Sequence, residues 1–161
     1  MDISDLHKLP LARIKVRGLV KCGDEYIFIQ RCRYGRHKKY LVFPGGRVKK
    51  SDRPRNDKTN LLTTFKTALE RELYEELAAT GVEIGELLGI SKHYKHDREV
   101  LFHVDISSFD WKARTGKEFS NPNKGTFEIV KVKSLTKETL GKKGYHLKPK
   151  EWRKMMYTLD V

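Results

Sequence analysis

The chain has 161 residues, of which 38% are hydrophobic and 34% are charged. This length predicts a single domain over residues 1–161, and the apolar fraction excludes an intrinsically disordered chain. Residues 1–10, expected to form an N-terminal tail, carry no signal-peptide pattern, and no apolar run is long enough to span a membrane. We therefore expect a soluble, cytoplasmic protein without a membrane partner.

Positive charge dominates the composition. The 34 Lys and Arg residues outnumber the 21 Asp and Glu residues, which gives a formal net charge of +13. This excess predicts an anionic partner, although it also serves solubility. Clustering of the charges near a functional site would favour the first interpretation. The composition makes no prediction about the oligomeric state.

Alternating apolar and polar side chains predict several strands. Ala12–Cys22 and residues 25–31 are expected to form a hairpin across the turn at Gly23-Asp24, and residues 40–43 a short third strand. Further strands are expected at residues 82–95, 98–106 and 126–132. Strands mixed with a few helices indicate a layered α/β or α+β domain.

The helices are predicted from apolar spacing and from helix-ending residues. Pro44-Gly45-Gly46 ends the third strand, and the polar, basic residues 47–58 are expected to form a loop. From Thr59 to Thr80 the apolar residues recur every three or four positions, which predicts a helix with Gly81 as its C-cap. Two further helices are expected, a short one from about residue 134 or 136 and a last one over residues 148–159.

Cys22 and Cys32 are the only cysteines. We expect two buried or half-buried free thiols, as in a reducing compartment, and a disulfide between neighbouring strands is the alternative. No histidine stands at ligand spacing from either cysteine, so the sequence does not predict a zinc site.

The long predicted helix concentrates negative charge on one face. With an advance of about 100° per residue, Glu72, Glu75 and Glu76 share one arc beside the apolar stripe. Glu70 lies on the other flank. Crowded carboxylates destabilise a helix, and Arg71 can offset only part of that cost. Oxygen ligands on one face suit Mg²⁺ or Mn²⁺, and a solvated acidic face with salt bridges to lysines is the alternative.

Two motifs frame this acidic face. Phe-Pro-Gly-Gly stands at residues 43–46, and Arg-Glu-Leu-Tyr-Glu-Glu stands at residues 71–76. With Gly81-Val82 they resemble the signature of the Nudix family of pyrophosphohydrolases, the Nudix box. That signature is Gly, five residues, Glu, seven residues, then Arg-Glu-apolar-x-Glu-Glu-x-Gly-apolar.

The match to the box has two departures, both in spacing. Gly46 and Asp52 match its first part, with Asp in place of Glu. Eighteen residues instead of seven then separate Asp52 from Arg71. Four residues instead of one separate Glu76 from Gly81, which predicts a helix about one turn longer than usual.

The resemblance implies a fold and an activity. The fold is an α/β/α sandwich around a mixed β-sheet. The activity is hydrolysis of the phosphoanhydride bond of a nucleoside diphosphate derivative, with water as nucleophile and Mg²⁺, or Mn²⁺, as cofactor. The implied roles are metal ligation by Glu72, Glu75 and Glu76, orientation of these carboxylates by Arg71, bending of the backbone into the substrate site at Gly45 and Gly46, and a structural or metal-adjacent role for Asp52.

The resemblance leaves the general base open. It is a carboxylate of the box, Glu72 or Glu75, or a glutamate on a later strand or loop, for which Glu128 is the candidate. Glu99 and Glu118 stand behind Glu128. For these two the preferred interpretation is an ordinary surface glutamate.

Basic residues cluster on both sides of the box, within residues 31–39 and 47–58. Both clusters are expected to border the metal site, with Arg31 and Arg47 binding substrate phosphates. A nucleotide with several phosphates fits this charge, and so does an RNA 5′ end, although the sequence contains no recognisable RNA-binding module. A third cluster, between Lys142 and Lys154, is expected to be a solvated surface.

The sequence leaves two alternatives open. The chain could bind nucleotide or RNA on the same scaffold without turning it over. The insertion at residues 53–61 is either a mobile flap beside the metals that closes over the substrate or a passive surface excursion.

Overall fold

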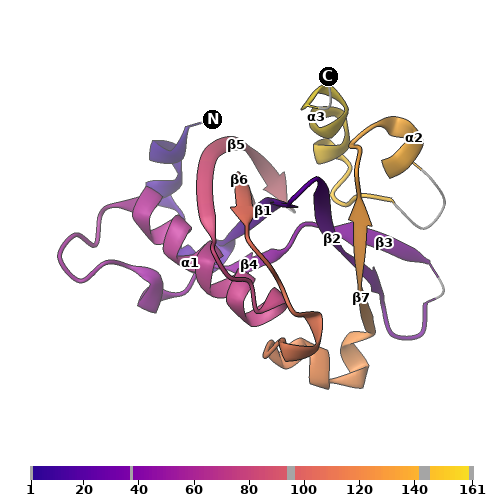
Figure 1. Cartoon of the computed structure of the whole chain (residues 1–161). Helices are drawn as coiled ribbons and strands as arrows, with labels where there is room; N and C mark the ends of the chain where they lie inside the picture. The colour runs from indigo at the N-terminus through magenta and orange to yellow at the C-terminus, as the bar shows by residue number, and fades with distance from the viewer. Residues whose placement is uncertain (1, 37, 94–96, 142–145, 160–161) are drawn as a thin grey trace.

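A computed structural model of the chain describes residues 2–36, 38–93, 97–141 and 146–159. At its centre is a seven-stranded mixed sheet with the order β3-β2-β1-β6-β5, in which β4 also pairs with β1 and β7 with β2 (Figure 1). The strands are β1 (Ile14–Cys22), β2 (Glu25–Cys32), β3 (Lys39–Val42), β4 (Gly45–Arg47), β5 (Glu83–His93), β6 (Asp97–Ile106) and β7 (Thr126–Val132). All except β4 were predicted, and the predicted residues 94 and 95 of the fifth strand lie outside the described residues.

Strands β1 and β2 form the expected hairpin but separate along their length. Their pairing runs from Cys22 opposite Glu25 only as far as Val20 opposite Ile27. Beyond that point β1 pairs with β4 and β2 pairs with β3. On their other edges, β1 pairs in parallel with β6 and β2 pairs with β7 along most of their length. The sheet is therefore split between β1 and β2, and the chain crosses the split at Phe43-Pro44, between β3 and β4.

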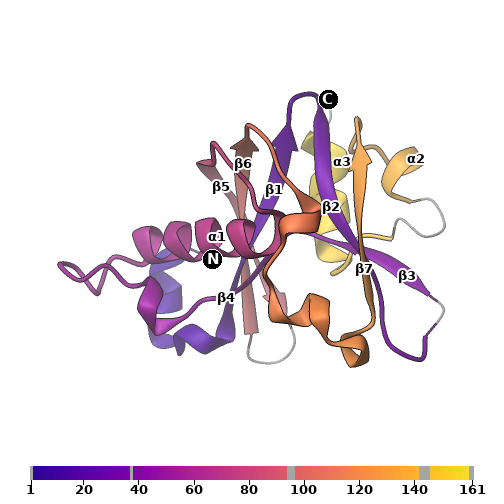
Figure 2. The same cartoon turned by 60° about the horizontal axis from the view of Figure 1, so that its bottom comes forward.

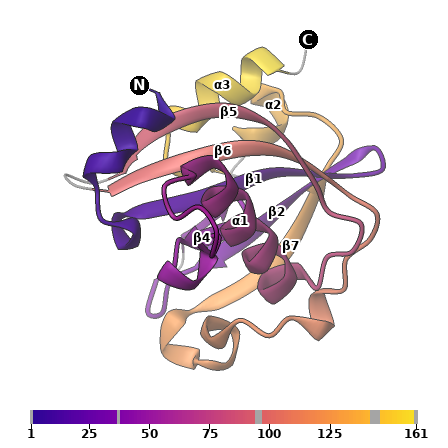
Figure 3. The ribbon, with the colours of Figure 1, turned by 90° about the vertical axis from the view of Figure 1, so that its left-hand side faces the viewer.

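Helices cover both faces of the sheet. α1 (Leu61–Leu77) packs on one face through fully buried residues such as Phe65 and Leu69. The short α2 (Lys137–Leu140) and α3 (Glu151–Leu159) lie on the other face, where Trp152 joins a second buried cluster. Figures 2 and 3 show α1 and α3 on opposite sides of the strands. The predicted α/β/α sandwich is confirmed.

Short 3-10 helices connect these elements. Two of them precede β1, and Leu6 in the first is fully buried, so residues expected as an N-terminal tail pack on the core. The 3-10 helices are η1 (Ile3–Lys8), η2 (Leu11–Arg13), η3 (Lys50–Asp52), η4 (Trp111–Ala113), η5 (Lys117–Ser120) and η6 (Pro122–Lys124).

Cys22 and Cys32 are free thiols at half-buried positions, as predicted. Within the described ranges, no helix combines the length and apolar character needed to cross a membrane.

The ends of α1 differ from the prediction. The side chain of Asn60 caps the first turn by accepting a hydrogen bond from Thr63 N at 3.1 Å. The helix ends at Leu77, because Ala78 adopts the left-handed conformation with φ 46°. The predictions of Gly81 as C-cap and of a helix one turn longer are therefore wrong. Ala78 occupies the position where the box signature has its last glycine.

Candidate active site

Two glycines bring the backbone of β4 against the acidic end of α1. Gly45 has φ 143°, and a Cβ atom there would overlap the carbonyl oxygen of Val16. At Gly46 a Cβ atom would lie 2.6 Å from Glu72 Oε1. The Gly45 N–H donates a hydrogen bond to Glu76 Oε2 at 2.9 Å. The backbone thus requires glycine at position 45, and any side chain at position 46 would displace the Glu72 carboxylate.

Arg71 connects the two separated parts of the box. Its Nε and Nη2 donate to the two oxygens of Asp52, each at 3.0 Å, and Asp52 is 3% exposed. Its Nη1 donates to Glu72 Oε1 at 2.9 Å and to Glu75 Oε2 at 3.3 Å. These partners raise the pKa of Arg71, with the Asp52 hydrogen bond as the largest cause. The eighteen-residue separation therefore leaves Asp52 in contact with the helix.

The donor set at this end of α1 consists of carboxylate oxygens. Glu72 and Glu76 are 8% and 7% exposed, and the side chain of Glu75 is 32% exposed. Arg71 contacts three carboxylates and carries a single positive charge, so negative charge is in excess here. Within the part of the chain that the structure describes, no three Asp, Glu, His or Cys side chains are already arranged to hold a metal ion. The chemistry of the donors nevertheless fits a hard divalent cation such as Mg²⁺.

A cavity of about 530 Å³ opens beside this end of α1. Glu76 lines it together with Gly45, Arg31 and Arg47, so the structure brings three residues predicted to bind substrate to one of the predicted metal ligands. The remaining lining residues come from the split sheet and from the loop before β7: Arg17, Ile29, Val42, Phe119, Asn121, Lys124 and Phe127.

Arg17 of β1 was missed by the sequence analysis. Its Nη1 donates to the carbonyl oxygens of Phe43 and Gly45, at 3.2 and 3.0 Å, and its Nε donates to Glu99 Oε1 at 3.1 Å. Glu99 is 1% exposed and also accepts from Trp152 Nε1 at 3.1 Å. The interpretation of Glu99 as a surface glutamate is therefore wrong. Glu99 thus binds Arg17, and Arg17 in turn binds the carbonyl oxygens of Phe43 and Gly45 on either side of Pro44.

Aromatic side chains that the sequence analysis missed form one wall of the cavity. The rings of Phe119 and Phe127 meet edge to face at 5.1 Å, and Phe119 meets Trp111 at the same distance. The guanidinium of Arg31 stacks 5.0 Å from the Phe127 ring. Thr115 N donates to the Glu75 carbonyl oxygen at 2.8 Å, which ties this loop to the end of α1.

The structure does not bring Glu128 to the cavity. Glu128 lies exposed on β7, and side chains alternate along a strand, so it points away from the face that carries Phe127 and Ile129. It is not among the residues that line the cavity. The side chain of Glu118 lies outside the described residues.

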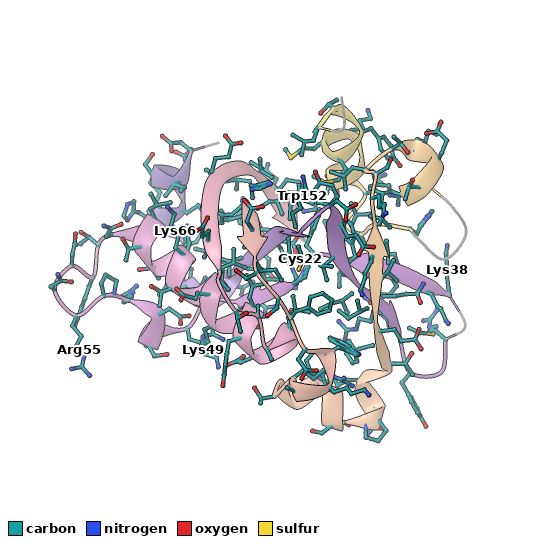
Figure 4. All side chains as sticks on the ribbon, viewed as in Figure 1. Cys22, Lys38, Lys49, Arg55, Lys66 and Trp152 are labelled. Atoms are coloured by element: carbon teal, nitrogen blue, oxygen red, sulfur yellow. The ribbon has the colours of Figure 1, made fainter. Side chains whose placement is uncertain are left out.

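The insertion in the box also lies away from the carboxylates. Figure 1 shows residues 53–60 projecting beyond the N-terminal end of α1, and Figure 4 shows Arg55 pointing away from the molecule. From Leu61 to Glu76 the helix spans about 22 Å. The projecting part of this loop therefore does not lie beside the carboxylates, whereas its first residue, Arg53, directly follows Asp52, which binds Arg71. Its basic residues line a separate hollow of about 420 Å³.

Comparisons with known proteins identify the fold. Neither a protein-family model nor a curated protein matches the chain. Among solved structures, the chain is similar to the MutT protein from Methanosarcina mazei Go1, with 18% identity, 95% of each chain covered and a TM-score of 0.54. A Nudix hydrolase from Nitrosomonas europaea gives 15% identity, coverage of 91% of this chain and 88% of that chain, and a TM-score of 0.55.

A third structure, the Bacillus subtilis pyrophosphohydrolase BsRppH, gives 15% identity and a TM-score of 0.51. The match covers 86% of this chain and 73% of that chain. The structural similarity extends over most of the chain, and the box residues lie where the sequence resemblance predicts a loop followed by a helix. The chain therefore has the fold of the Nudix hydrolases.

Proposed function

We propose that the chain hydrolyses a phosphoanhydride bond in a nucleoside diphosphate derivative, with water as nucleophile and Mg²⁺ or Mn²⁺ at the acidic end of α1. The observation that best supports this is one cavity that joins Glu76 and Gly45 to Arg17, Arg31 and Arg47. Guanidinium groups on one side suit diphosphate oxygens, and carboxylates on the other suit a cation.

The side chains of the site would have two kinds of role, binding of the cation and orientation of its ligands. Glu72, Glu75 and Glu76 would hold the cation, which supplies neutralisation of phosphate charge and a more acidic bound water. Arg71, anchored by Asp52, orients two of these carboxylates. We assign the general base to Glu75 and not to Glu128, because Glu75 keeps access to solvent next to the other box carboxylates.

The nucleoside would lie against the aromatic wall. Phe119 and Phe127 are half-buried and line the same cavity as Glu76. Aromatic faces bind bases by stacking, which tolerates different bases. Arg31, stacked on Phe127, would contact the phosphates next to the nucleoside.

A scaffold that binds nucleotide or RNA without turnover is the competing function. The stretched box favoured it at the level of sequence. The position of residues 53–60 beyond the far end of α1 weakens that argument, because the insertion leaves the contact between Asp52 and Arg71 in place.

Turnover of a substrate panel separates the two functions. We expect the protein with Mg²⁺ to hydrolyse a member of a panel of nucleoside triphosphates, nucleotide sugars, dinucleoside polyphosphates and 5′-capped RNA, with products identified by mass. Glu76→Gln should lower kcat by about 10²–10³, and Glu70→Gln, on the opposite flank of α1, should keep the wild-type kcat. Binding without turnover across the panel, or wild-type kcat in Glu76→Gln, would contradict the proposal.

A further inference from the structure

A second cavity, of about 570 Å³, lies on the α3 side of the sheet. Its lining includes eight Lys or Arg residues and two Glu residues. Lys148, Lys150 and Arg153, from the start of α3 and the segment before it, are three of the eight. They belong to the C-terminal basic cluster that was expected to be solvated surface; Lys148 and Lys150 are exposed, as expected, and all three residues also line this cavity.

The sheet supplies the rest of the positive charge. Lys15 and Arg17 come from β1, Arg31 and Arg33 from β2, and Lys92 from β5. The two glutamates do not balance this charge, because Glu99 already binds Arg17 and Trp152 in the core. Burial and the neighbouring Arg17 lower the pKa of Lys15. The cavity is therefore an electropositive site with a surplus of cations.

This cavity adjoins the candidate active site through the split in the sheet. Arg17, Arg31 and Val42 line both cavities. Arg31 Nε is buried and has no hydrogen-bond partner among the described residues. Its guanidinium stacks on Phe127 in the first cavity. Arg31 therefore borders both cavities.

We propose that the second cavity binds a phosphate group of the substrate that is not part of the cleaved diphosphate. The substrate then carries phosphate at a second position. This inference rests on the proposed function for the ligand of the first cavity. A 3′-phosphate on the nucleotide and the first phosphodiester of an RNA 5′ end both present this chemistry. Lys148 and Lys150 line the cavity and are exposed, and they are the residues that a phosphate would contact as charged hydrogen-bond donors.

The test measures binding of ligands that cannot be hydrolysed at an anhydride. AMP, adenosine 3′,5′-bisphosphate and the 5′-phosphorylated dinucleotide pApA, with their guanosine equivalents, are titrated calorimetrically into wild type. The variants are Lys150→Gln, Lys148→Gln and, as a matched control, Lys154→Gln. Lys154 is an exposed lysine of α3 that does not line the cavity. Because none of these ligands has an anhydride, the outcome is independent of turnover.

We expect the bisphosphate or the dinucleotide to bind about tenfold more tightly than the monophosphate. This advantage should shrink several-fold in Lys150→Gln and Lys148→Gln, persist in Lys154→Gln, and fall with added salt. If the dinucleotide binds more tightly than the bisphosphate, the second phosphate belongs to an RNA end. If these two ligands bind equally tightly, and both more tightly than the monophosphate, it is a 3′-phosphate. Equal affinities for all three ligands, or an advantage that survives in both cavity variants, would overturn the inference. If no member of the substrate panel is hydrolysed but the bisphosphate or dinucleotide still binds more tightly than the monophosphate, only the proposed function is contradicted.

Discussion

The position of the Glu72 carboxylate depends on the absence of a side chain at Gly46. Glu72 is largely buried, and its carboxylate occupies the space that any side chain at position 46 would need. The neighbouring Gly45 holds Glu76 by its backbone N–H. Two successive residues without side chains thus set the positions of two of the three proposed metal ligands.

Gly46→Ala should displace the Glu72 carboxylate, because the new Cβ would lie 2.6 Å from Glu72 Oε1. We expect kcat to fall about 10- to 100-fold on any substrate of the panel, with a smaller effect on the melting temperature than on turnover. Gly85→Ala is the control, since a Cβ atom at Gly85 makes only ordinary van der Waals contacts. Unchanged kcat in Gly46→Ala would show that Glu72 does not need its present position.

How far the site could be predicted depends on how local its residues are. Glu72, Glu75 and Glu76 stand within five consecutive residues, and helix periodicity alone places them on one arc. Arg17 and Glu99 are separated by 82 residues, and only the parallel pairing of β1 with β6 brings them together. No local pattern reveals such a pair. The aromatic wall was missed for the same reason, because Phe119 and Phe127 come from a loop and a strand.

At the scale of elements, α1 was the most predictable part of the chain and its end the least. Along its seventeen residues the apolar side chains recur at regular spacing, which predicts a helix that packs on a sheet. The C-cap was misjudged because glycine is the usual residue at φ above zero, and here Ala78 takes that conformation instead. Strand β4 was missed because three residues, two of them glycine, show no alternation.

Ala78→Gly should stabilise the protein. Alanine at φ 46° raises the free energy of the folded state by about 1–2 kcal/mol, which glycine avoids, although glycine loses more entropy on folding. We expect a net gain of about 1 kcal/mol, or about 2–4 °C in melting temperature for a domain of this size. Ala79→Gly, next in sequence at a buried position without positive φ, should lower the melting temperature. An equal effect of both substitutions would contradict the strain at Ala78.

At the scale of the whole molecule, the split between β1 and β2 separates two cavities of different charge. It places one cavity on the α1 side, where carboxylates meet arginines, and another on the α3 side, where cations dominate. The net charge of +13 is therefore not spread evenly over the surface. The basic residues of the insertion, residues 53–60, take no part in either cavity.

Binding of a divalent cation at the acidic end of α1 is tested most directly by electron paramagnetic resonance of Mn²⁺. The signal of free Mn²⁺ is followed while wild type, Glu76→Gln and Glu70→Gln are titrated into the solution, which requires no substrate. We predict that wild type and Glu70→Gln remove Mn²⁺ from the free pool with equal affinity and that Glu76→Gln binds it at least tenfold more weakly. Equal binding by all three proteins, or no binding by wild type at millimolar Mn²⁺, would contradict the assignment of Glu72, Glu75 and Glu76 as a metal site.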